Sequence, residues 1–440
     1  MGNAAPRKVS ATGVMGRLMR TVKILVVAAT TLCLPSLASA QLSEPCLDLD
    51  GVMHLAAAQN PRVATREAQL QGAAADLTEA RSLFRPQISG FARTGAGDVG
   101  LIDSAMQNQV GLRASQRVFD FGDARLARET ARHAIDASEY DVALSELEAA
   151  SEVGSAVLDM HQAAEAITLT SSRRDYFERQ LAAIDSVLDQ GGSTRSERAE
   201  VAAQLANANA FVLELRAQYD RALTRIDIQT GATENLCKKE IFEADFASLG
   251  EQIDTIGEAV ERALYDAPGL RAMRARVNSI GAESKRESIA RLPIISVVGS
   301  AAYSQVGNGA FDVQERIGLD ISVPFYTGNA LAARGQRANA RHQAAKSEIA
   351  EQRRQIEQDV RITFQNILSL QAQTSAARNF EDRSRELFEF AQIEYEVGRR
   401  TLPDLIDIRL EFEQASLQSI QTKFNLSRER LRLFTLTGGG

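Results

Sequence analysis

The chain of 440 residues has no tryptophan, 5% aromatic residues and a formal net charge of −7. The scarcity of aromatic residues argues against thick globular cores and favours long helices, and the acidic balance argues against a nucleic-acid partner. We assign no catalytic residue, metal site or cofactor, because no nucleophile motif is visible and no metal-ligand spacing connects His54, His133, His161 and His342.

The first 40 residues have the pattern of a secretory signal peptide. Basic residues precede an apolar run over 24–34, and small residues follow up to residue 40, where cleavage is expected. The apolar run is too short to span a membrane. Since this segment contains five basic residues and no acidic one, its loss changes the formal net charge from −7 to −12. Cys33 leaves with it, so Cys46 and Cys237 remain in a compartment that permits disulfides.

The next stretch predicts helices followed by two strands. A helical pattern runs from Leu47 to about Phe84 and should break at Asn60-Pro61. Residues 87–94 and 110–118 alternate with period two, which predicts two strands. Between them, Gly95 to Gly100 spells GxGxxG. Because no helix follows it, we expect a glycine-rich hairpin loop and not a dinucleotide site.

A very long helical pattern then runs from Ala124 to Gln190. At 1.5 Å per residue such a helix would reach about 100 Å, and its heptad-like spacing argues for coiled-coil packing. We expect Gly191 to form the turn at its tip, a shorter helix to return over 198–230, and residues 232–249 to act as a linker.

The second half repeats this layout at an offset of about 207 residues, as Pro61 with Pro268 and Pro86 with Pro293 illustrate. We expect Gly398 to end its long helix. The predicted elements are a helix to about 291 broken near 267–268, strands over 294–305 and 313–325, a long helix over 330–397 and a return helix over 405–437. The predicted domains are a signal peptide (1–40), a first repeat (41–231), a linker (232–249) and a second repeat (250–440).

Each repeat thus contributes two strands about as long as a transmembrane β-strand, in an exported chain. Aromatic residues gather at the strand ends, which suits an interfacial girdle. Packing of the strands on ordinary helices is the alternative. Four strands cannot close a barrel, and open edges in lipid would leave backbone groups unpaired. Closure therefore requires more than one chain.

With this layout the chain resembles the TolC-like outer-membrane channel family. The resemblance rests on the duplicated order of elements, the two strands preceded by proline, the turn Phe325 to Gly328 and the tip Tyr395 to Asp407. It implies a mainly α fold with a β-barrel portion. In that fold, three identical chains supply four transmembrane strands each to a 12-stranded barrel, above a long periplasmic α-helical coiled-coil barrel.

The resemblance also assigns roles at the tips. Asp404 and Asp407 are similar to the acidic residues that ring the periplasmic entrance. Tyr395 and Arg400 are similar to residues that latch it by hydrogen bonds to the other repeat's tip, where Glu197 stands in place of the family's Asp. The further latch residues are Ser196 and Gln180. An ordinary capped helical hairpin with solvated charges is the alternative for all of them.

By this resemblance the protein is the outer-membrane exit duct of a tripartite export machine, with a large periplasmic portion. We expect type I protein secretion, and a multidrug or small-molecule efflux duct is the alternative. The implied partners are a periplasmic adaptor protein, an inner-membrane ABC or RND transporter and outer-membrane lipid. A hypothesis of a different class is a periplasmic coiled-coil scaffold or adhesin without a pore, against which the four strands argue.

The family layout brings Cys46 and Cys237 to the same level of the tunnel, because each precedes a helix that begins a repeat. A disulfide between them is therefore one expectation, and two isolated thiols are the other, since spacing along the chain does not give the distance between their Cα atoms.

Overall fold

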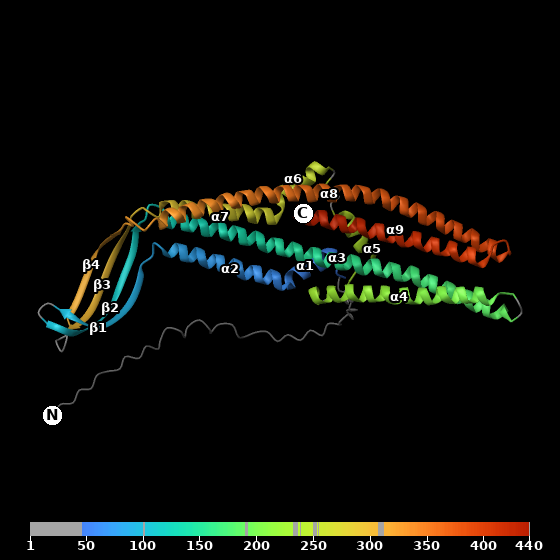
Figure 1. Ribbon diagram of the computed structural model, residues 1–440, viewed down its shortest axis with the longest axis horizontal. Coiled ribbons are helices and arrows are strands. Elements are labelled where there is room, and N and C mark those ends of the chain that lie inside the picture. Colours follow the sequence, from blue (N-terminus) through green and yellow to red (C-terminus); the bar gives the residue numbers. More distant parts are fainter. Residues whose placement is uncertain are drawn as a thin grey trace, which may run out of the picture. The chain divides into compact units, whose positions relative to one another are not determined.

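The computed structural model describes residues 46–99, 102–189, 192–231, 236–237, 239–249, 253, 255–306 and 312–439. Residues 46–440 form one unit, in which the four strands lie at one end of the long helices and the helical tips lie at the other (Figure 1). The predicted signal peptide at residues 1–40 lies outside the described residues.

The first half of this unit contains the predicted elements in the predicted order. Asn60 separates the first two helices because its side chain accepts a hydrogen bond from the Arg62 N–H, while Pro61 occupies the first helical position without losing a bond. The elements are α1 (Leu49–Gln59), α2 (Pro61–Ser82), β1 (Gln87–Val99), β2 (Ile102–Phe119), α3 (Asp123–Leu188) and α4 (Arg195–Thr230).

The second half repeats the order, with Pro268 at the break between its first two helices. The strand expected over 313–325 ends at Ser322, and the return helix begins at Leu402, three residues before its predicted start. The elements are α6 (Ile256–Asp266), α7 (Pro268–Ile289), β3 (Ile294–Val306), β4 (Asp312–Ser322), α8 (Ala330–Glu396) and α9 (Leu402–Thr437).

The predicted linker over 232–249 contains a further helix, α5 (Lys239–Ser248). Phe242 and Phe246 are four residues apart, so they lie on one face of this helix, and both are buried. They join a core formed mainly by α1, α3, α4 and α9. The helix therefore depends on packing against distant segments, which a local sequence pattern does not reveal.

The four strands form one antiparallel sheet in the order β1-β2-β3-β4. The expected hairpin loop at Gly95 to Gly100 is wrong in its first part, because Gly95 pairs with Gln107 and Gly97 with Ala105 inside the sheet. Glycine weakens a strand but does not prevent pairing when a long partner strand supplies the backbone groups. Residues 100 and 101, between β1 and β2, lie outside the described residues, as do residues 307–311 between β3 and β4.

The long helices pack as two hairpins, α3 with α4 and α8 with α9, and α3 also packs against α9. Near the tips, apolar side chains of all four helices form one cluster that includes Phe177, Leu205, Phe388 and Leu405. None of the described helices has a stretch apolar enough to cross a membrane.

A disulfide joins Cys46 to Cys237, so the first of the two expectations for this pair is confirmed. The backbone supports the bond, because the Cys237 N–H donates to the Leu47 carbonyl at 2.9 Å and Leu47 forms a parallel bridge with Leu236. The bond connects the residues before α1 to the segment between the two halves. The two cysteines are 191 positions apart in the sequence, and for a loop of this length the loop-entropy model gives about 5 kcal/mol.

We expect the mature protein, unfolded without reductant, to show no thiol that reacts with a maleimide, and two after reduction. Cys46→Ser is the matched control, because it should expose one reactive thiol at Cys237 without reduction. Two reactive thiols in the unreduced wild-type chain would contradict the bond.

Candidate functional site

The tip of the second half joins α8 to α9 through Gly398, whose φ of +73° is a left-handed conformation that favours glycine. The Thr401 side chain caps α9 by accepting from the Asp404 N–H at 3.4 Å, and its hydroxyl donates to Asp404 Oδ2 at 2.6 Å. Asp404 and Asp407 both lie on the exposed face of the first turns of α9. The carboxylates predicted to form acidic rings are therefore free to face solvent.

The tip of the first half is held by a capping box at the start of α4. Glu197 accepts from the Thr194 N–H at 2.8 Å and from the Ser193 hydroxyl at 2.9 Å. These hydrogen bonds lower the pKa of the Glu197 carboxyl, the one from the Thr194 backbone contributing most. The Glu197 carboxyl is therefore ionised at neutral pH. The predicted turn residue Gly191 lies outside the described residues.

The structure brings some of the predicted latch residues together. Tyr395 is partly buried, and burial followed by the nearby Glu197 charge raises the pKa of its phenol. Arg400 instead donates to Glu394 Oε2 of its own helical hairpin, from Nη2 at 2.7 Å and from Nε at 2.9 Å. Ser196 is exposed on α4, and Gln180 is half-buried on α3. The contact between Arg400 and Glu197 stays a prediction.

The four-stranded sheet has two chemically different faces. On one face, the paired positions carry mostly exposed apolar side chains; Glu315 is an acidic exception. Ile317 on β4 is 83% exposed. The apolar members are Ile88, Val110, Leu112, Val297, Tyr303, Val313, Ile317, Leu319 and Ile321.

The opposite face of the sheet is largely polar. Arg93 and Arg113 place their guanidinium groups over the Phe91 ring, at 5.0 and 5.8 Å from its centroid. Gln314 and Arg316 of β4 lie on the same face. A sheet with one exposed apolar face and one polar face suits a boundary between an apolar medium and water.

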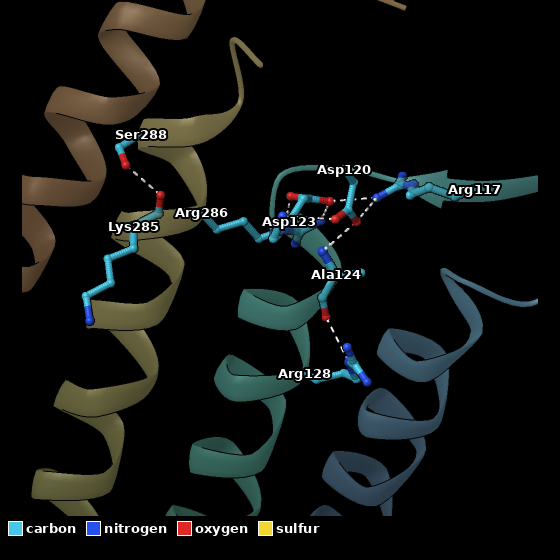
Figure 2. Close-up of polar contacts among 9 residues, drawn as sticks. Arg117, Asp120, Asp123, Ala124, Arg128, Lys285, Arg286 and Ser288 are labelled. Atoms are coloured by element: carbon cyan, nitrogen blue, oxygen red, sulfur yellow. Dashed lines mark hydrogen bonds and ion pairs between the residues drawn. The ribbon is translucent and has the colours of Figure 1, made fainter. Parts of the chain in front are cut away.

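An ionic network fixes the sheet to the helices where β2 ends (Figure 2). Asp120 is buried and accepts from the Gly122 and Ala124 N–H groups at 3.0 and 2.8 Å. Asp123 accepts from Arg117 of β2 at 2.8 Å and from Arg286 of α7 at 2.8 Å. The network therefore connects β2, α3 and α7.

Burial alone would raise the pKa of Asp123, but the hydrogen bonds and charges of Arg286 and Arg117 outweigh it and lower that pKa. The second half lacks this network, because Tyr326 and Asn329 occupy the positions of Asp120 and Asp123. There, the Leu331 N–H reaches the Thr327 hydroxyl at 3.5 Å. The two junctions between sheet and helix are thus unequal.

Sequence reasoning missed one buried polar cluster, formed by Arg173, Arg409 and Glu413 between α3 and α9. The signal was present, because Arg409 and Glu413 continue the three-to-four-residue spacing of Leu402, Leu405 and Ile406 on α9. Charged residues on such a stripe are expected to be buried with partners.

Comparison with known proteins gives a family match over most of the chain. The family described as "Outer membrane efflux protein" matches residues 52–232 and 259–439, which is once in each half. The solved CmeC outer membrane channel of Campylobacter jejuni has the same fold, with a TM-score of 0.75 at 16% identity over 89% of this chain and 86% of that one. A CusC structure gives a TM-score of 0.77 at 14% identity over 90% and 93%.

Similar proteins differ in what their names say they export. Outer membrane efflux protein BepC of Brucella suis is 24% identical over 82% of this chain and 78% of its own length. Alkaline protease secretion protein AprF of Pseudomonas aeruginosa is 22% identical over 59% and 55%. Pyoverdine export outer membrane protein OpmQ of the same species is 23% identical over 80% and 74%.

The junction network yields a prediction with a defined pH dependence. Arg286→Met should lower the melting temperature at neutral pH by about a degree, since a partly exposed ion pair contributes about 1 kcal/mol or less. The pKa of Asp123 is lower in the folded state than its ordinary value of 3.8. The ionised carboxylate therefore contributes its full stabilisation of the fold above pH 3.8, and this contribution is lost as the pH falls through the folded pKa. The difference between wild type and variant should therefore shrink in acid.

Lys285→Met is the matched control, because Lys285 is the adjacent residue and its ammonium points away from the network (Figure 2). Equal melting temperatures for wild type and Arg286→Met at neutral pH would show that the network contributes nothing.

Proposed function

Because the chain belongs to the outer membrane efflux protein family, we propose that it is the exit duct of a tripartite export assembly. The protein is an outer-membrane efflux channel with a large periplasmic helical part, and it is not an enzyme.

The main support for this proposal is the four-stranded sheet, which has one apolar face and two open edges. Within the described part of one chain, β1 pairs only with β2 and β4 only with β3. Backbone groups on an open edge cost several kcal/mol each in hydrocarbon. Three copies, with β1 of each paired to β4 of the next, give a closed 12-stranded barrel and satisfy every edge.

The apolar face of this barrel then contacts lipid, and the polar face lines its interior. In the same trimer, the exposed carboxylates of Asp404 and Asp407 become two rings of like charge at the periplasmic end. Such rings favour cations and bind multivalent ones. Tyr395, Arg400 and Glu197, with Ser196 and Gln180, form the latch that keeps the two tips of each protomer inward.

For the cargo we infer type I protein secretion, with a periplasmic adaptor and an inner-membrane ABC transporter as partners. The Tyr395 to Asp407 tip and the similarity to the protease secretion protein AprF support this route. Small-molecule efflux with an RND transporter is the second candidate, favoured by the longer matches to BepC and OpmQ. Co-purification of the adaptor and transporter would decide between the two routes. A poreless scaffold or adhesin does not agree with the family.

Conductance in planar bilayers tests the duct directly. The detergent-extracted wild-type protein should form cation-selective channels. Protein that dissolves without detergent and leaves bilayers silent would overturn the proposal.

The lipid-facing assignment predicts an asymmetric response to arginine on β4. Ile317→Arg should reduce the amount of protein assembled in the outer membrane, because arginine on a lipid-facing position costs about 2–4 kcal/mol at the bilayer midplane. Gln314→Arg is the matched control, because it changes the opposite face of the same strand. Equal membrane-assembled amounts of the two variants would contradict the assignment of faces.

The gate assignment predicts that substitutions in the latch change the conductance of the channel and that substitutions in the acidic ring change its ion selectivity. Arg400→Ser combined with Tyr395→Phe should raise single-channel conductance, since each exposed pair holds the tip by only about 0 to 1 kcal/mol and three copies act together. Asp404→Ala and Asp404→Asn should both weaken cation selectivity and block by multivalent cations, because both remove the ring charge. Arg399→Ser is the control, as the adjacent exposed arginine. If the double variant has the conductance of wild type and the Asp404 variants have its selectivity, these residues do not form the gate.

A further inference from the structure

The buried stripe of α9 changes from apolar to charged just beyond the tip. Leu402, Leu405 and Ile406 bury their side chains, and Arg409 and Glu413 continue the same face while only 5% and 1% exposed. Two charged residues in such a position are costly unless other groups compensate them. The groups that surround Arg409 and Glu413 therefore indicate the role of this cluster.

Glu413 is compensated by α3. Arg173 Nη1 lies 3.0 Å from Glu413 Oε2, and Arg173 Nη2 donates to Asn207 Oδ1 of α4 at 2.8 Å. Burial raises the pKa of Glu413, whereas the charges of Arg173 and Arg409 lower it. One carboxylate thus connects α9 to α3, and through Arg173 to α4.

Arg409 is held mainly by aromatic rings. Its guanidinium carbon lies 4.9 Å from the ring centroid of Phe388, 5.3 Å from that of Phe412 and 5.4 Å from that of Tyr176. These rings come from α8, α9 and α3. Its Nη2 also reaches the Ser172 hydroxyl at 3.5 Å. Arg409 therefore sits in a cage to which both helical hairpins contribute.

The charged cluster is not needed to stabilise the fold, because apolar residues could fill the same positions. Among the described residues, Arg409 Nε, Arg173 Nε and the Tyr176 hydroxyl have no hydrogen-bond partner, and the one carboxylate of the cluster, that of Glu413, is paired with Arg173. Well-packed apolar residues at such positions are often as stable as a buried ion cluster or more so. A guanidinium is planar and stacks on aromatic faces, so the cage constrains the orientation of the Arg409 side chain more closely than apolar packing would.

We propose that Arg409 is a positioning residue for the periplasmic gate, and that its aromatic cage fixes the rotation of α9 so that Asp404 and Asp407 face the channel axis. Asp407 lies two residues before Arg409 on the same helix, and at 3.6 residues per turn any rotation of α9 turns all three side chains together. The apolar residues Leu402, Leu405 and Ile406 would resist such a rotation less specifically. This inference rests on the gate assignment proposed above.

The test compares Arg409→Met with a triple variant, Arg173→Met, Arg409→Met and Glu413→Leu. Arg409→Met leaves the neutral pair of Arg173 and Glu413, and the triple variant leaves an apolar core, so both should melt at or near the wild-type temperature. Both should nevertheless conduct severalfold more than wild type and lose cation selectivity, because the acidic rings are no longer held at the axis. Arg432→Met, an exposed arginine of the same helix, is the control and should behave as wild type.

Glu413→Gln separates stability from positioning, because it leaves two buried guanidinium groups without a carboxylate and should melt well below wild type. Hydrogen exchange of the amides of residues 402–408 supplies a readout that needs no channel. It should be faster in Arg409→Met than in Arg432→Met.

If the wild type conducts but Arg409→Met keeps its conductance and selectivity, the positioning role is wrong and the duct stands. If the wild type forms no channel, the proposed function fails and the gate role fails with it. Exchange over 402–408 then tests only whether the cage holds α9: equal exchange in the two variants overturns that part of the inference, and faster exchange in Arg409→Met supports it. Should Arg409→Met fail to fold, Arg409→Lys replaces it. Lysine keeps the charge without the planar group that stacks on the rings, so its conductance should also exceed that of wild type.

Discussion

Within the described part of one chain, no strand is paired with the outer edges of β1 and β4, and these open edges govern the rest of the arrangement. In water such edges are tolerable, but beside an exposed apolar face that contacts lipid they are not. In the proposed duct, a ring of identical chains would pair the edges and would also bring the helical tips of all protomers to one axis. The charge of the tips is then important, because carboxylates that lie far apart in separate chains would come close together around the axis and repel one another.

The helical part uses two kinds of contact with different consequences. Apolar packing of Phe177, Leu205 and Leu405 holds the hairpins together without a strong directional preference. The ionic contacts are directional: Asp120 and Asp123 fix the first junction to the sheet, and Glu413 of α9 pairs with Arg173 of α3 near the tip. Because the second junction lacks these acids, the two halves of the chain hold the sheet unequally despite their similar layouts.

The order of elements was predictable because its breaks are local. Asn60-Pro61, Gly398 and Thr401 end or cap helices through their own backbone and side chains. Three features escaped prediction because tertiary contacts decide them. Gly95 is in a strand because β2 pairs with it, α5 is a helix whose Phe242 and Phe246 bury in a distant core, and the Arg409 cage is assembled from three helices. The disulfide stayed open at the sequence level, since its distance depends on the fold.

In the proposed duct, neighbouring chains complete one another's sheet. Electron cryomicroscopy of the mature protein in lipid nanodiscs tests it most directly. We expect three chains around one axis, with the β1 backbone of each chain hydrogen-bonded to β4 of its neighbour and Ile317 facing lipid. A single chain whose β1 and β4 edges have no strand beside them would contradict it, as would pairing of β1 with β4 within the same chain.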